Sequence, residues 1–186
     1  AWLEGMEDAV ANLEELYLDG GANTAAGLAA FKDCEKITSL SLTHMKPTAE
    51  GLQHFSKCKH LRVLFLGGTS IDDVSLEAFA GCTELERLDV RNTGMNGAEL
   101  VHFKNCEKLS SVDLSRVRSL DKAALENLKN CNLKWLNVGD TDIDDEALAF
   151  LNDHQQLEYL NIAGTKVSDD FVKALQESLP DCEISR

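Results

Sequence analysis

The residues best suited to chemistry in this chain are six cysteines, and their spacing argues against a metal site. Five of them recur 24 or 25 residues apart, and none forms the CxxC pair that zinc sites commonly use. A disulfide between neighbours would need Cα atoms within about 6.8 Å, and we expect successive units to spread apart on that side. The pattern predicts small, buried, reduced thiols, which favour a cytoplasmic setting. The five are Cys34, Cys58, Cys82, Cys106 and Cys131.

The remaining titratable residues suggest no catalytic set. The five histidines mostly occupy different positions within the 24-residue repeat, so the sequence predicts no catalytic Ser/His/Asp or Cys/His set. The pair Asp144-Asp145 could hold calcium weakly, but Asp144 is better explained as a helix N-cap and Asp145 as a favourable first-turn charge. No phosphate-binding loop is present. The sequence predicts no enzyme, no cofactor and no metal site.

An apolar pattern repeats every 24 residues from Leu13 to the C-terminus. Each copy reads apolar, two other residues, apolar, one other residue, apolar, and it ends with the alternation of a short strand. A fixed period of this length indicates stacked units in a solenoid. The seven copies begin at Leu13, Ile37, Leu61, Leu85, Leu109, Leu133 and Leu157.

A helix is expected after each strand and turn. In every copy, the residue at the expected helix start is of a type whose side chain can accept hydrogen bonds from the free backbone N–H groups of the first helical turn. Two apolar columns three residues apart should then face the core. The expected N-caps are Thr24, Thr48, Asp72, Asn96, Asp121, Asp144 and Ser168, and four successive copies of the second apolar column suggest a stacked row of Phe31, Phe55, Phe79 and Phe103.

The copies resemble leucine-rich repeats over essentially the whole chain. Residues 61–79 (LRVLFLGGTSIDDVSLEAF) and 157–175 (LEYLNIAGTKVSDDFVKAL) closely follow the LxxLxLxGTxVTDxGLxxL pattern of bacterial arrays. The cysteines resemble those in the repeats of F-box substrate receptors. The resemblance implies a right-handed α/β solenoid, or horseshoe, with a parallel sheet on the concave face and helices on the convex face. Because Thr mostly replaces the usual Asn after the strand, we expect a Thr-based and incomplete hydrogen-bonded ladder at Thr69, Thr93, Thr141 and Thr165.

One solenoid domain accounts for the 186 residues. Residues 13–178 are predicted to form seven repeats. Residues 1–12 are interpreted as part of a preceding repeat or as an N-terminal cap, and residues 179–186 as a C-terminal half-repeat cap. The fifth repeat has an extra residue within 115–119, which we interpret as a tolerated loop insertion.

The charge balance limits the classes of partner. The 18 basic and 32 acidic residues give a formal net charge of −14 at pH 7. Phosphate backbones and anionic lipids repel such a chain, so nucleic acid and membrane surfaces are not expected partners. A protein or peptide is the expected ligand.

The expected partner-binding residues lie between the buried positions of the strands. Neighbouring strands lie about 4.8 Å apart, so each outward position forms a column across the sheet. Both Tyr residues and one of the two Trp residues fall on these columns, and aromatic and Arg side chains dominate interface energies. We expect a central and a C-terminal patch, although aromatic pairs could instead stabilise the sheet or be covered by another part of a longer protein. The predicted residues are Tyr17, Val63, Phe65, Arg87, Asp89, Arg91, Asp113, Trp135, Asn137, Tyr159 and Asn161.

The sequence therefore favours non-catalytic protein recognition on the concave face. One alternative is the substrate-receptor or adaptor portion of a larger enzyme, such as a ubiquitin ligase or a kinase, whose chemistry lies outside these residues. Another is a structural spacer with an empty concave face. Solvent-facing aromatics count against the spacer.

Overall fold

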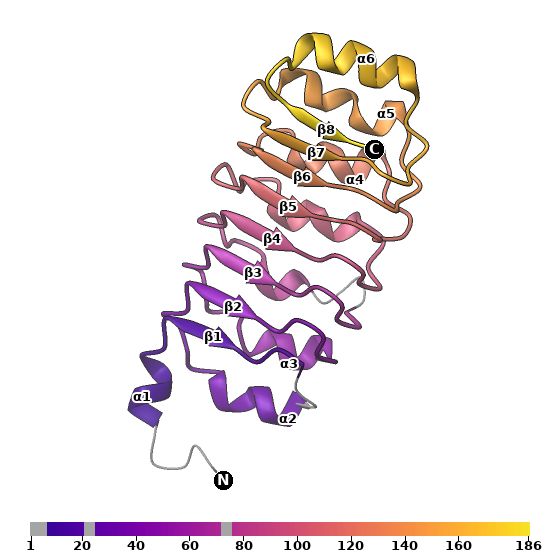
Figure 1. Ribbon diagram of the computed structural model, residues 1–186. Coiled ribbons are helices and arrows are strands. Elements are labelled where there is room, and N and C mark those ends of the chain that lie inside the picture. The colour runs from indigo at the N-terminus through magenta and orange to yellow at the C-terminus, as the bar shows by residue number, and fades with distance from the viewer. Residues whose placement is uncertain (1–6, 21–24, 72–75) are drawn as a thin grey trace.

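The computed structural model describes residues 7–20, 25–71 and 76–186, which form one stack of similar turns (Figure 1). Within this part of the chain, eight strands pair in chain order into one open parallel sheet. Each strand residue pairs with the residue 24 positions later, as Leu16 does with Leu40 and Leu40 with Leu64. Because of this register, residues at the same repeat position form columns across the sheet. The strands are β1 (Glu15–Tyr17), β2 (Ser39–Ser41), β3 (Val63–Phe65), β4 (Arg87–Asp89), β5 (Ser111–Asp113), β6 (Trp135–Asn137), β7 (Tyr159–Asn161) and β8 (Glu183–Ser185).

Short helices cover one side of the sheet, and the other side is left open (Figure 1). We call the open side the outer face; it corresponds to the predicted concave face. The predicted α/β solenoid of leucine-rich repeats is confirmed. Its helices are α1 (Glu7–Ala11), α2 (Ala25–Leu28), α3 (Ala49–Gln53), α4 (Lys122–Leu125), α5 (Asp145–Leu148) and α6 (Asp169–Ser178), with the 3₁₀ helices η1 (Ala29–Phe31), η2 (Leu76–Phe79), η3 (Ala98–Phe103), η4 (Glu126–Leu128) and η5 (Ala149–Asp153).

Polar side chains begin several of these helices as predicted. Thr48, Asp121, Asp144 and Ser168 each accept the backbone N–H three residues later, at 2.8–3.2 Å. Asn96 instead accepts the N–H two residues later, at 2.9 Å, before the 3₁₀ helix η3. The predicted caps Thr24 and Asp72 lie outside the described residues.

The core lies between the sheet and the helices. The middle residue of each strand points into it, and Leu64 and Leu136, for example, are completely buried. The phenylalanine column is also buried, with the rings of Phe31 and Phe55 stacked at a centroid distance of 6.5 Å. Among the described residues, that pair makes the only ring contact within the column. The phenylalanines therefore fill space in successive repeats more than they stack.

The cysteine column is buried and reduced, as predicted. Thiols of successive repeats donate to carbonyls one repeat earlier: Cys58 Sγ lies 2.8 Å from Cys34 O, and Cys82 Sγ lies 3.4 Å from Cys58 O. In the irregular fifth repeat, Cys131 Sγ reaches only Phe103 O, at 4.0 Å. Burial raises the pKa of Cys58 and of Cys131 to about 12. These thiols are structural donors and poor nucleophiles.

The turn after each of β1 to β7 has a residue with left-handed backbone at the same repeat position, φ 50–69°, and in four of these turns a threonine follows it. The threonine that follows binds within its own turn: Thr69 Oγ1 donates to Leu66 O, and Thr141 Oγ1 to Val138 O, both at 2.6 Å. The predicted threonine hydrogen bonds are therefore present at these four turns, but each hydroxyl binds within its own turn and none forms a ladder between neighbouring repeats. The left-handed residues are Gly20, His44, Gly68, Asn92, Arg116, Asp140 and Gly164.

Candidate partner-binding face

The predicted binding residues lie on the outer face or at its edge. The first and third residues of each strand alternate with the buried middle residue, so their side chains leave the core. Tyr17, Arg87 and Arg91 are exposed, whereas Asp113 is only 8% exposed. The others are half-buried: Val63, Phe65, Asp89, Trp135, Asn137, Tyr159 and Asn161.

Four of these residues have a structural role that the sequence reasoning missed. The side-chain Oδ1 at the last position of β4, β5, β6 and β7 accepts the backbone N–H two residues later, at 2.9–3.0 Å. Such Asx turns end the strand and start the following bend. The available signal was four successive Asp or Asn residues at one repeat position. They are Asp89, Asp113, Asn137 and Asn161.

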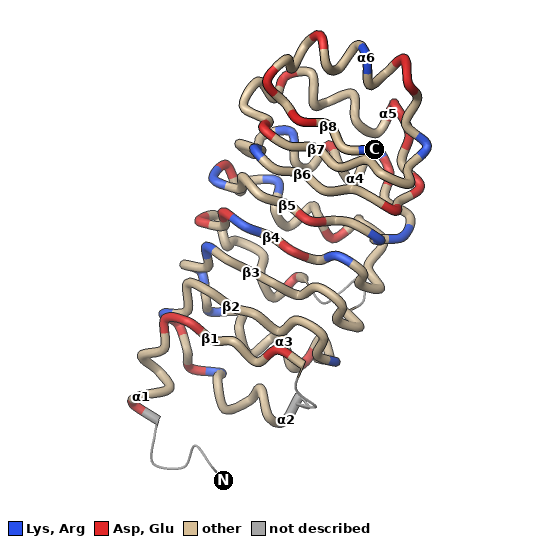
Figure 2. The backbone as a smooth tube through the Cα atoms, viewed as in Figure 1, with Lys and Arg blue, Asp and Glu red and all other residues tan. Residues whose placement is uncertain are grey.

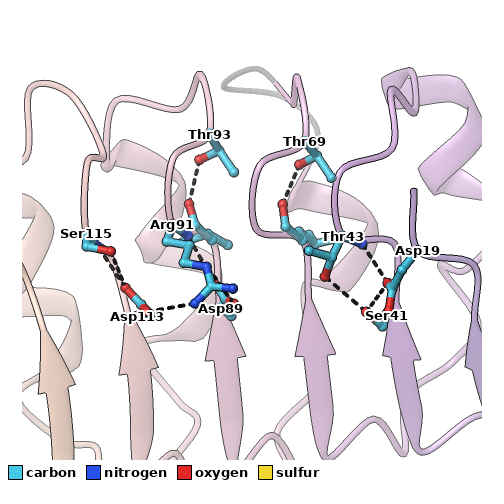
Figure 3. A network of polar contacts seen from close by, with 11 residues as sticks. Asp19, Ser41, Thr43, Thr69, Asp89, Arg91, Thr93, Asp113 and Ser115 are labelled. Carbon is cyan, nitrogen blue, oxygen red and sulfur yellow. Dashed lines mark hydrogen bonds and ion pairs between the residues drawn. The ribbon is translucent and has the colours of Figure 1, made fainter. Parts of the chain in front are cut away.

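Asp113 departs furthest from the expected solvent-facing position. Its Oδ1 accepts the backbone N–H of Ser115 at 2.9 Å and the Ser115 hydroxyl at 2.7 Å. Its Oδ2 lies 3.9 Å from Nη1 of Arg91 (Figure 3). These neighbours cover the carboxylate, so Asp113 positions the turn and Arg91 more than it offers a free surface group.

The central patch combines two apolar side chains with a charged network. Val63 and Phe65 on β3 pair in register with Arg87 and Asp89 on β4. Burial raises the pKa of Asp89, while the Arg91 backbone N–H and guanidinium oppose that rise. Arg91 Nε lies 3.5 Å from Asp89 Oδ2. Within the described ranges Arg87 makes no ion pair, so this patch presents one exposed, uncompensated cation.

Tyr17 lies apart from both patches, on the end strand β1. Its hydroxyl and that of Ser39 are 2.9 Å apart. Nearby, Asp19 bonds to the Ser41 hydroxyl and accepts the Thr43 backbone N–H at 3.0 Å (Figure 3). The N-terminal part of the face is therefore a polar network with one exposed aromatic ring.

The C-terminal patch consists of Trp135 and Asn137 on β6 and Tyr159 and Asn161 on β7. The two aromatic rings stack with centroids 5.6 Å apart and planes 11° apart. Strands β6 and β7 contain no charged residue (Figure 2). The patch is thus a neutral, half-exposed aromatic surface on a strongly acidic chain.

A hollow of about 320 Å³ lies at the carboxyl ends of the strands, beside the C-terminal patch. Asn137 and Asn161 line it together with the left-handed turn residues His44 and Arg116, and with Arg91 from the central patch. Arg116 is held by Asp140, at 3.1 Å from Nε to Oδ2. The hollow therefore connects the two patches along a polar edge.

Charged residues on the flanks of the sheet pair between neighbouring repeats. Arg62 and Glu86 lie 2.8 Å apart, and Lys134 and Glu158 lie 3.0 Å apart. These pairs are exposed and contribute little to stability. Across the described ranges, no group of three or more His, Cys, Asp or Glu could hold a metal ion, and no helix is long and apolar enough to cross a membrane.

Comparison with known proteins agrees with this architecture. The BspA-type leucine-rich repeat region matches residues 24–157 in six copies, and no curated protein sequence matches the chain. An internalin of Listeria monocytogenes, InlF, has a TM-score of 0.76 at 18% identity, over 96% of this chain and 48% of its own. Internalin C2 of the same bacterium has a TM-score of 0.73 at 20% identity, over 96% of this chain and 72% of its own. This chain spans about half the length of InlF, and both likenesses concern the fold. The chain belongs to the BspA-type leucine-rich repeat family.

Proposed function

We propose that this chain is a non-catalytic recognition module that binds a protein partner on the outer face of its sheet. The observation that carries the proposal is the stacked pair of Trp135 and Tyr159, half-exposed on two neutral strands. Solvent-facing aromatic surface on a folded domain marks an interaction site, and aromatic residues supply much of the energy at such sites. The central patch, with Phe65 and Arg87, is a second anchor.

The fold and the charge support the same proposal. Leucine-rich repeats are generally used for protein–protein interaction, and parallel stacked strands form an extended surface. A formal charge of −14 disfavours nucleic acid and anionic membranes as partners. The exposed aromatics disfavour a spacer with an empty face.

Affinity capture with matched variants tests the proposal. The unmodified chain and a Phe65→Ala/Trp135→Ala double variant would be used side by side on lysate from the source organism. Val101→Ala serves as the control, because Val101 is a 41% exposed apolar residue in η3, on the helical side. Capture is quantified by mass spectrometry, after thermal unfolding has shown that all three proteins are folded.

The expected result is a set of proteins retained by the unmodified chain and by Val101→Ala and lost by the double variant. Proteins retained equally by the double variant would place binding on another surface. Loss with Val101→Ala alone would move it to the helical side. Either outcome would overturn the outer-face assignment.

A further inference from the structure

The amide groups of the C-terminal patch have a fixed orientation. Asn137 Oδ1 accepts the Gly139 backbone N–H at 3.0 Å, and Asn161 Oδ1 accepts that of Ala163 at 2.9 Å. Because a backbone N–H can only donate, these bonds decide which side-chain atom is oxygen and which is nitrogen. Each Nδ2 group therefore keeps its N–H donors for other partners. Both residues line the hollow at the carboxyl ends of the strands.

The two aromatic side chains add further donors to the same patch. The Trp135 indole has an N–H group and Tyr159 has a hydroxyl, and within the described part of the chain neither side chain makes a hydrogen bond. Partly buried Trp and Tyr polar groups usually have partners. The patch thus combines stacked rings with four donor-bearing side chains, and the Asn oxygens already serve the backbone.

A ligand that complements this patch offers carbonyl acceptors, few N–H donors and a flat apolar surface. A proline-rich segment in polyproline II conformation has these properties, because proline lacks the backbone N–H and this helix has no internal hydrogen bonds. Such segments dock on aromatic surfaces. One turn of polyproline II advances about 9 Å, close to the width of two strands at about 4.8 Å each.

The charge next to the patch specifies the ligand further. Glu183 on β8 pairs in register with Tyr159 and is exposed. No described residue forms an ion pair with Glu183. A Lys or Arg beside the prolines could approach both the Tyr159 ring and the Glu183 carboxylate. An acidic flank would be repelled there, as it would be by the chain as a whole.

We propose that Trp135, Asn137, Tyr159 and Asn161 bind a proline-rich segment of a protein partner, with a basic residue of that segment next to Glu183. This inference rests on the proposed recognition function and names the chemistry of its ligand. The side-chain amides and the indole donate to ligand carbonyls, and the stacked rings contact the proline rings.

The test uses the full chain and a defined probe: an oligoproline peptide that ends in lysine. A Gly/Ser peptide of equal length that also ends in lysine has the same charge but no preference for polyproline II. Calorimetric titration measures both affinities. The unmodified chain should bind the oligoproline peptide at least about ten-fold more tightly than the Gly/Ser peptide.

Asn161→Asp is the most informative variant. Asp retains an oxygen for the Ala163 N–H, as Asp89 and Asp113 do at the same repeat position, but it has no donor. We expect roughly ten-fold weaker oligoproline binding. Asn132→Asp, at an exposed loop position outside the patch, introduces the same charge and should bind as the unmodified chain does.

A second variant keeps the test decisive if Asn161→Asp fails to fold. Trp135→Phe keeps an aromatic ring but removes the indole N–H, and it too should weaken binding. Equal affinity for the two peptides, or equal affinity of the Asn161→Asp and Asn132→Asp variants, would overturn the proposal. If the capture experiment nevertheless shows partners lost by the Phe65→Ala/Trp135→Ala variant, recognition on the outer face stands and only the proline-rich ligand is wrong.

Discussion

At the scale of single residues, the outer face has two kinds of position. The last residues of β4 to β7 hold the backbone of the following turn, whereas the aromatic residues at the first positions of β6 and β7 hold no backbone group. Mutations at the two kinds of position should therefore have different effects. Loss of an Asx oxygen should lower stability, and loss of an aromatic ring should mainly lower binding.

Asp113 provides the sharpest stability test at this scale. Asp113→Ala removes the acceptor for both the backbone N–H and the hydroxyl of Ser115. We expect the free energy of unfolding to fall by about 1–3 kcal/mol, measured by urea denaturation. Asp113→Asn keeps an acceptor oxygen, so its free energy of unfolding should fall by less. An alanine variant as stable as the unmodified chain would show that the Asx turn is dispensable.

Because of the buried thiols, we expect the free energy of unfolding to depend on pH. Burial raises the pKa of Cys58 from 9.0 to about 12 and that of Cys131 to about 12. Between these values the unfolded chain has lost thiol protons that the folded chain keeps. The stabilisation of the folded chain by its buried, protonated thiols is therefore full below pH 9 and is lost as the pH rises towards 12.

Urea denaturation over this pH range measures the effect. Lysines also titrate there, so the comparison is with Cys58→Ala, whose free energy of unfolding should fall less steeply with pH. Equal slopes for the two proteins would contradict the assignment of Cys58 as a buried thiol that is ionised only on unfolding.

At the scale of elements, the sequence predicts most of the repeat unit. The strand columns and the caps at Asp121 and Asp144 follow from residue types that recur at one spacing. The left-handed turn position was not predicted, because only some repeats have glycine there and others have residues such as His44 and Arg116. The repeat-to-repeat register supports that backbone, since Arg116 N donates to Gly139 O at 3.0 Å. A single sequence shows the residue type but not this neighbouring support.

Substitutions at core positions of the strands should lower the free energy of unfolding more in the middle of the stack than at its end. Leu64 on β3 is completely buried between two neighbouring strands, whereas Leu16 on the end strand β1 is 7% exposed. We expect Leu64→Ala to lower the free energy of unfolding by about 2–5 kcal/mol, and Leu16→Ala to cost less. Thermal and urea denaturation of both variants would check this order. Equal losses would contradict a core whose packing weakens at the first strand.

At the scale of the whole molecule, the fold separates stability from recognition. Buried columns and hydrogen bonds between neighbouring repeats hold the stack, and strands β1 and β8 lie at its opposite ends (Figure 1). Strand alternation also predicted which residues leave the core, although Asp113 among them is covered by its neighbours. The sequence did not predict the hollow beside Asn137 and Asn161, because turns from several repeats form it. The outer face can therefore carry partner contacts with little effect on the core.

Site-specific photo-crosslinking tests the central claim most directly. A photoreactive residue at Arg87, exposed on the outer face, is compared with one at Val101, exposed on the helical side. Both proteins are illuminated in lysate from the source organism. The account predicts discrete protein adducts from position 87 that disappear when Trp135→Ala is added, and none of these adducts from position 101. The same adducts from position 101, or adducts from position 87 that persist with Trp135→Ala, would contradict partner recognition through the outer face.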